Sequence, residues 1–159
     1  MSTISLSKNI STTHKAVSQS TQPAETPCTG ELILIRGLPG SGKSRMGNIL
    51  SLIGFEHYEA DQYFVKNGSY HYEANKVREA HLWCQAKVRT ALANSKRVVV
   101  CNTFTRISEM EPYLGLTPTV RILEAKGKWK NIHGVSAERI KQMAERWEKL
   151  PSSLQHLAR

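Results

Sequence analysis

The sequence has few cysteines, a single aspartate and no long apolar run, and these shortages exclude several classes of protein. Cys28, Cys84 and Cys101 are odd in number and lack CxxC spacing, so neither a disulfide framework nor a zinc site of that type is expected. We therefore expect a reducing, cytoplasmic compartment. No apolar run approaches the length that a bilayer requires, so we expect no membrane partner.

The first 29 residues also lack hydrophobic periodicity. They are rich in Ser and Thr and contain Pro23 and Pro27, so they cannot bury enough apolar surface to offset the entropy of ordering. We expect a disordered arm over residues 1–29 and one folded domain over residues 30–159. A chain of 159 residues is long enough for one α/β domain, and we expect it to be a monomer.

Positive charge is in excess, with a formal net charge of +9 at pH 7. From Arg121 onward there are nine Lys and Arg residues against four Glu residues. This excess favours polyanionic partners such as nucleic acid, although a basic isoelectric point alone more often reflects solubility than a specific ligand.

Strand and helix patterns alternate along the folded part. Continuous apolar runs predict buried strands, and apolar residues at spacings of three and four predict helices. Strands are expected near residues 32–35, 56–60, 98–101 and 119–123, and helices near residues 43–53, 72–93, 109–114 and 136–150. For the last helix, Ser136 is the expected N-cap, and Pro151 follows its end. The order predicts an α/β fold with a parallel sheet of four to five strands flanked by helices.

A glycine-rich motif directly follows the first strand and opens the first helix: Gly37-Leu38-Pro39-Gly40-Ser41-Gly42-Lys43-Ser44. In that context, it matches the phosphate-binding P-loop, also called Walker A, in which backbone N–H groups and the helix start face phosphate oxygens. Lys43 is expected to reach the β and γ oxygens, Ser44 to bind Mg²⁺, and Arg45 to lie beside the nucleotide. The alternative is a glycine-rich turn that only connects strand and helix.

Asp61, the only aspartate of the chain, follows the second expected strand. The carboxyl ends of parallel strands share one edge of a sheet, where ligands bind, so Asp61 is expected to face the terminal phosphate. There it can accept a proton from an acceptor hydroxyl or help to orient Mg²⁺. The alternative is that Asp61 only caps the turn after the strand.

The strand over residues 98–101 ends in Asn102 and Thr103, where many P-loop proteins carry a magnesium-positioning acid. Their side chains can hydrogen-bond a metal-bound water or the acceptor, or they can simply terminate the strand. Arg106 follows closely and is a further candidate for contact with the acceptor.

A basic segment separates the last strand from the last helix and contains Lys126, Lys128, Lys130 and His133. Two glycines interrupt it, which is typical of a mobile lid. Cations in a lid can close over a triphosphate and neutralise charge on the transferred group. The alternative is a solvated basic loop.

Together, the segments 36–44, 60–64, 102–110 and 131–135 resemble the zeta-toxin and polynucleotide-kinase-like group of P-loop proteins, over roughly residues 32–151. The resemblance implies an ATP-dependent kinase that uses Mg²⁺ and transfers the γ-phosphoryl group to a hydroxyl, most characteristically the 5′-hydroxyl end of a nucleic acid. It implies that Asp61 is the general base and that residues 129–133 belong to the lid.

The chain also departs from that group. Phe64 stands where polynucleotide kinases carry an arginine that holds the acceptor, the lid offers lysines and His133 but no arginine, and Cys101 stands where relatives commonly have aspartate. Two other hypotheses therefore stay open: a nucleotide-dependent binding or switch module with little catalysis, and a kinase of small metabolites.

Overall fold

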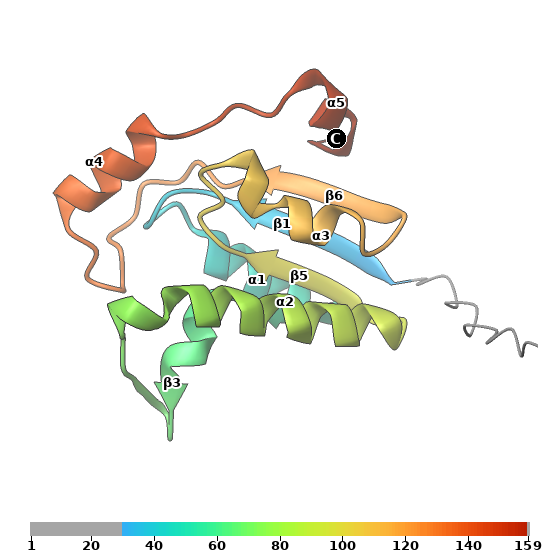
Figure 1. Cartoon of the computed structure of the whole chain (residues 1–159), viewed down its shortest axis with the longest axis horizontal. Coiled ribbons are helices and arrows are strands. Elements are labelled where there is room, and N and C mark those ends of the chain that lie inside the picture. Colours follow the sequence, from blue (N-terminus) through green and yellow to red (C-terminus); the bar gives the residue numbers. More distant parts are fainter. Residues whose placement is uncertain (1–29, 159) are drawn as a thin grey trace, which may run out of the picture.

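The structure is a computed structural model that describes residues 30–158; the segment predicted as a disordered arm lies outside the described residues. At the centre is a four-stranded parallel sheet in the order β2, β5, β1, β6 (Figure 1). Its strands are β1 (Glu31–Arg36), β2 (Phe55–Tyr58), β5 (Arg97–Cys101) and β6 (Thr119–Glu124). The predicted α/β class and parallel sheet are confirmed.

The central strand β1 is buried on both faces because its side chains alternate between two apolar clusters. Leu32 and Leu34 belong to the larger cluster, and Ile33 and Ile35 to the smaller one on the opposite face. A strand between two covered faces needs apolar residues at every position, which explains the continuous apolar run in the sequence.

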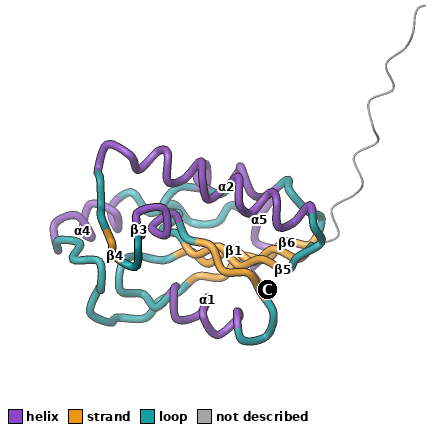
Figure 2. The backbone as a smooth tube through the Cα atoms, turned by 90° about the horizontal axis from the view of Figure 1, so that it is seen from below, coloured by secondary structure: helices purple, strands orange, loops and turns teal. Residues whose placement is uncertain are grey.

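Helices cover both faces of the sheet. The helix α1 (Lys43–Ser51) packs on the smaller cluster, whereas α2 (Val77–Ala93) and α3 (Glu111–Leu114) pack on the larger one. Figure 2 shows α1 and α2 on opposite sides of the strands. The resulting three layers leave the carboxyl ends of the strands open at one edge, where the segments predicted to carry chemistry meet.

The remaining elements are short. They are the hairpin of β3 (Val65–Lys66) and β4 (Ser69–Tyr70), the helices α4 (Ala137–Glu145) and α5 (Ser152–Gln155), and the 3₁₀ turns Ala60–Phe64, Ala74–Lys76, Ile107–Glu109 and His156–Ala158. Within residues 30–158, none of the helices has both the length and the apolar character to cross a membrane.

The first helix differs from its predicted pattern. Met46 and Leu50 pack on the core, but Ile49 and Ile53, which share the predicted apolar stripe, are 62% and 61% exposed. The helix also ends at Ser51, two residues early. Apolar spacing therefore predicted the helix correctly but not which of its residues are buried.

The last predicted helix is also shorter. The Ser136 hydroxyl accepts a hydrogen bond from the Arg139 amide at 3.3 Å, as expected of an N-cap, but α4 ends at Glu145. Beyond it, the Glu148 amide donates to the Thr105 carbonyl at 2.8 Å. The backbone there bonds to another segment instead of to its own preceding turn, so the helix cannot continue to residue 150.

Candidate functional site

The phosphate-binding loop lies between β1 and α1, as the sequence predicted. Gly40 and Gly42 have φ angles of 80° and 92°, a left-handed region that favours glycine. The Lys43 ammonium donates to the Leu38 carbonyl at 3.0 Å across the loop. Burial lowers the pKa of Lys43, although nearby Glu59, Cys101 and Asp61 oppose that effect. The loop thus has the strand, turn and helix that phosphate binding by main-chain amides requires.

The segment after β6 lies directly against this loop. The Trp129 amide donates to the Gly40 carbonyl at 2.8 Å, and the Gly127 amide donates to the Ser41 carbonyl at 3.1 Å. The Trp129 ring covers Gly42, since a Cβ atom added there would lie 2.6 Å from the ring. The predicted lid segment is therefore in contact with the phosphate-binding loop.

A cavity of roughly 560 Å³ opens where these segments meet, within the size range of small-ligand sites. Many of the predicted site residues line it: Pro39, Gly40, Gly42, Lys43, Ser44, Arg45, Asp61, Asn102, Thr103, Lys130 and His133. The predicted site residues that do not line it are Gly37, Leu38, Ser41, Arg106 and Lys128. Arg106 instead caps the 3₁₀ turn Ile107–Glu109.

Asp61 stands in the 3₁₀ turn after β2, and its side chain is 44% exposed. The Tyr70 hydroxyl donates to its Oδ1 at 3.5 Å, and the Nε2 atom of His133 in the lid segment lies 3.8 Å from its Oδ2. Burial and the neighbouring Asp61 charge raise the pKa of Tyr70 to about 12, so the phenol stays protonated. Asp61 is thus an accessible carboxylate on the cavity wall.

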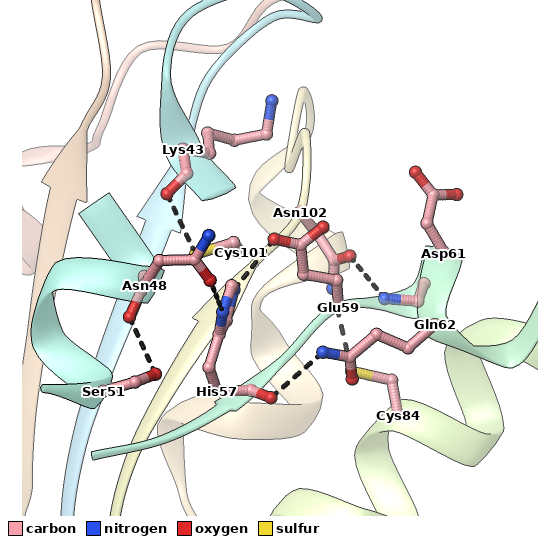
Figure 3. A network of polar contacts seen from close by, with 12 residues as sticks. Lys43, Asn48, Ser51, His57, Glu59, Asp61, Gln62, Cys84, Cys101 and Asn102 are labelled. Atoms are coloured by element: carbon pink, nitrogen blue, oxygen red, sulfur yellow. Dashed lines mark hydrogen bonds and ion pairs between the residues drawn. The ribbon is translucent and has the colours of Figure 1, made fainter. Parts of the chain in front are cut away.

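Asn102, which directly follows β5, is held by the turn after β2. Its Oδ1 accepts a hydrogen bond from the Ala60 amide at 3.0 Å, and the residue is buried. That bond joins the end of β5 to the turn that carries Asp61 (Figure 3). Thr103 is tied to the phosphate-binding loop, because its carbonyl accepts from the Gly37 amide at 3.2 Å.

Glu59 is a site residue that sequence reasoning missed. Its side chain, only 13% exposed, lies with Oε1 2.8 Å from the His57 Nε2. Burial raises the pKa of Glu59, but interactions with His57, Ser44 and His133 together outweigh burial and leave the pKa below its ordinary value. The sequence placed Glu59 inside a predicted strand over residues 56–60 and gave it no role. In the structure the strand ends at Tyr58, so Glu59 lies just after it.

Arg36, the last residue of β1, was also missed. It is fully buried, and its guanidinium donates to the carbonyls of Phe104 and Glu148 at 3.1 and 2.8 Å. The Trp147 ring lies 3.9 Å from its central carbon. An arginine at the end of an apolar strand directly before the loop was the available signal, since a buried arginine requires several fixed acceptors.

Comparisons with known proteins agree with this fold. No family model matches the chain. The human NEDD4-binding protein 2 is 34% identical over 137 residues, a match that covers 76% of this chain and 8% of that protein. The chain therefore spans less than a tenth of the length of this curated relative.

Among solved structures, a chain of the Pnkp1/Rnl/Hen1 RNA repair complex superposes with a TM-score of 0.53 and 14% identity, covering 84% of this chain and 44% of that one. A second structure of the Pnkp1/Rnl/Hen1 complex gives a TM-score of 0.51 with 15% identity, over 80% and 43% of the two chains. Together with the strand, loop and helix of the site, these likenesses define the fold: the protein has the P-loop NTPase fold.

Proposed function

We propose that residues 30–159 bind ATP with Mg²⁺ and transfer its γ-phosphoryl group to a hydroxyl, in the manner of the zeta-toxin and polynucleotide-kinase group. The observation that carries this proposal is that the phosphate-binding loop and the accessible Asp61 carboxylate line one cavity. A kinase needs a polyphosphate cradle and a proton acceptor near each other, and most of its catalysis is positioning and charge stabilisation.

In this proposal the amides of the loop hold the phosphates, and the partly desolvated Lys43 ammonium supports the oxygens of the transferred group. Asp61 accepts the proton of the attacking hydroxyl, and His133 and Tyr70 orient its carboxylate. His133 and Lys130 belong to the lid and line the cavity, and the Lys130 ammonium supplies positive charge to it.

The oxygen donors that line the cavity fit Mg²⁺: the Ser44 hydroxyl and the Glu59 and Asp61 carboxylates. When bound with the nucleotide, Mg²⁺ neutralises charge on the phosphate oxygens.

We further propose that the acceptor is the 5′-hydroxyl end of a nucleic acid. The cavity wall beyond Asp61 has aromatic and basic side chains, among them Tyr70, Tyr72 and Arg139. Such a surface suits stacked bases and phosphates. The nucleic-acid end also fits the net charge of +9.

The test is phosphoryl transfer from labelled ATP to a panel of acceptors: 5′-hydroxyl RNA and DNA oligonucleotides, nucleosides and sugars. We expect label on the oligonucleotides. Asp61→Asn should reduce transfer by about 100-fold or more while ATP binding survives, because a positioned base contributes about 10²–10⁴-fold. Glu145→Gln, on the exposed surface of α4, is the matched control and should transfer normally. No label on any acceptor would overturn the proposal, and label on sugars alone would indicate a small-metabolite kinase.

One observation favours a second candidate, a nucleotide-dependent binding or switch module. The lid backbone is bonded to the phosphate-binding loop at Gly40 and Ser41, so nucleotide in the loop can change the position of the lid. In that case ATP would bind and change the position of the lid without phosphoryl transfer to any acceptor. Asp61→Asn would then leave both ATP binding and the change in the lid intact.

A further inference from the structure

The strand β5 ends without an acid beside the phosphate-binding loop. It pairs with β1 so that Cys101 lies next to Ile35, just before the loop. In P-loop NTPases an aspartate on a strand next to the loop joins the loop hydroxyl in holding Mg²⁺. Here the Cys101 thiol is buried and lies 3.4 Å from the Lys43 carbonyl, to which it donates. Burial raises the pKa of Cys101, so this soft, neutral group is a poor ligand for Mg²⁺.

A carboxylate from the neighbouring strand reaches the same place. Glu59 directly follows β2, which pairs with β5 on the side away from β1. Ligand atoms of His57, Glu59 and Cys101 all lie within 4.8 Å of one another. The Glu59 carboxylate is also hydrogen-bonded with Ser44, the loop hydroxyl expected at the metal. In Figure 3 the Glu59 side chain extends toward Cys101 and the start of α1, whereas Asp61 projects away from both.

His57 holds this carboxylate in position. Its Nε2 lies 2.8 Å from Glu59 Oε1, and its Nδ1 lies 3.1 Å from the Oδ1 of Asn48 on α1. The imidazole is therefore fixed at both nitrogens, between the helix and the carboxylate.

Gly47 shows that the close approach of the imidazole is built into α1. A Cβ atom at Gly47 would lie 2.5 Å from the His57 Nε2 and 2.8 Å from the Cys101 sulfur. Glycine inside a helix costs roughly 0.5–1 kcal/mol relative to alanine. Glycine at position 47 therefore leaves room for the His57 imidazole beside α1, and a larger residue there would fill that space.

We propose that Glu59, positioned by His57, supplies with Ser44 the oxygen ligands for Mg²⁺, in place of the acid that is absent from the end of β5. The inference rests on the proposed function only in that a magnesium–nucleotide complex binds to the loop. In this inference Glu59 binds Mg²⁺, and Asp61 faces the acceptor. The sequence had assigned both roles, metal orientation and proton acceptance, to Asp61.

The test is ATP affinity measured by calorimetry with Mg²⁺ and with EDTA, for the wild type and four variants. We expect Mg²⁺ to strengthen ATP binding by the wild type. Glu59→Gln should lose about tenfold or more of that enhancement, because even outer-shell partners of a metal site are worth about 10–100-fold in metal affinity. Its affinity for ATP in EDTA should stay normal, which also shows that the variant is folded.

Three further variants sharpen the test. Glu56→Gln on β2 is the matched control and should keep the full enhancement, because Glu56 contacts Tyr58 and does not line the cavity. His57→Gln should lose part of it. The double variant Cys101→Asp with Glu59→Gln should recover the strengthening of ATP binding by Mg²⁺, because it has an acid at the end of β5.

An enhancement that Glu59→Gln retains in full would overturn the inference while leaving the proposed function intact. Tight Zn²⁺ binding without nucleotide, lost in both Glu59→Gln and Cys101→Ser, would also overturn it and indicate a soft-metal site. A different pair of results would separate the two proposals the other way. If Glu59→Gln lost the magnesium-dependent ATP binding of the wild type, the inference would be supported. If the same wild type phosphorylated no acceptor, the proposed function would be contradicted.

Discussion

At the scale of single residues, Arg36 links three parts of the chain that surround the site. Its guanidinium joins the end of β1 to the loop after β5, through the carbonyls of Phe104 and Thr105, and to the C-terminal stretch, through Glu148. Burial lowers the pKa of Arg36, opposed by the charges of nearby glutamates. The side chain thus fixes the strand that leads into the phosphate-binding loop.

Arg36→Met should lower the free energy of unfolding by about 3 kcal/mol, because it leaves the buried Phe104 carbonyl and the part-buried Glu148 carbonyl without the arginine donor. Urea denaturation measures this change. Lys141→Met, an exposed change on α4, is the control and should shift stability by less than about 0.5 kcal/mol. If Arg36→Met were as stable as the control, the linking role of Arg36 would be wrong.

The sequence predicted some site residues and missed others for a physical reason. Lys43 and Ser44 were predicted from a local motif of fixed spacing, and both line the cavity of the candidate site. Glu59 and Arg36 were not, because their roles depend on contacts with His57, Ser44 and Glu148, which only the folded chain brings together. Local spacing determines the phosphate-binding loop, and tertiary contacts determine the residues that support it.

At the scale of elements, the lid segment and the phosphate-binding loop form one unit. The Trp129 backbone bonds to Gly40, and its ring covers Gly42, with the Arg45 guanidinium 5.7 Å from the ring centre. A nucleotide that enters the loop therefore changes the surroundings of this indole. Because the sequence predicted only a basic lid, the tryptophan contact is a finding of the structure.

Magnesium and ATP should change the tryptophan fluorescence of the protein, and Trp129→Phe should remove most of that change. Trp83→Phe is the matched control, because Trp83 packs beside Tyr63 on the larger apolar cluster. A titration of each variant measures the signal. A signal that survives in Trp129→Phe and disappears in Trp83→Phe would contradict the contact between lid and nucleotide.

The helices show how far periodicity predicts an element. Apolar spacing predicted α1, but the exposed Ile49 and Ile53 lie outside the sheet contact that Met46 and Leu50 make. For α4, periodicity continued through Trp147, although that ring packs on Arg36 from beyond the helix end. Spacing cannot distinguish a helical stripe from an extended segment that packs on a distant side chain.

At the scale of the whole molecule, the parallel sheet brings residues distant in sequence to one edge. Its order, β2, β5, β1, β6, sets the end of β2 beside that of β5 and so brings Glu59 near Cys101. The sequence predicted the strands and their parallel arrangement from strand and helix alternation. The order of the strands in the sheet could not be predicted from the sequence, because strand pairing depends on the packing of both sheet faces together.

The excess of positive charge predicts a salt-dependent interaction with nucleic acid. For a single strand that contacts about three phosphates, the affinity for a 5′-hydroxyl oligonucleotide should fall about tenfold or more between 50 and 200 mM salt. Lys130→Ala, on the cavity wall, should reduce the slope, whereas Lys141→Ala on α4 should not. Fluorescence anisotropy measures both. Affinity that is independent of salt would contradict an electrostatic contact with the acceptor.

The central claim is that the main-chain amides between Gly37 and Ser44 hold the phosphates of a nucleoside triphosphate, and calorimetry with ATP and Mg²⁺ tests it most directly. The account predicts saturable binding by the wild type and affinity at least about tenfold weaker for Lys43→Ala, which removes a charged phosphate contact. A well-folded wild type that takes up no nucleotide at millimolar ATP would contradict it.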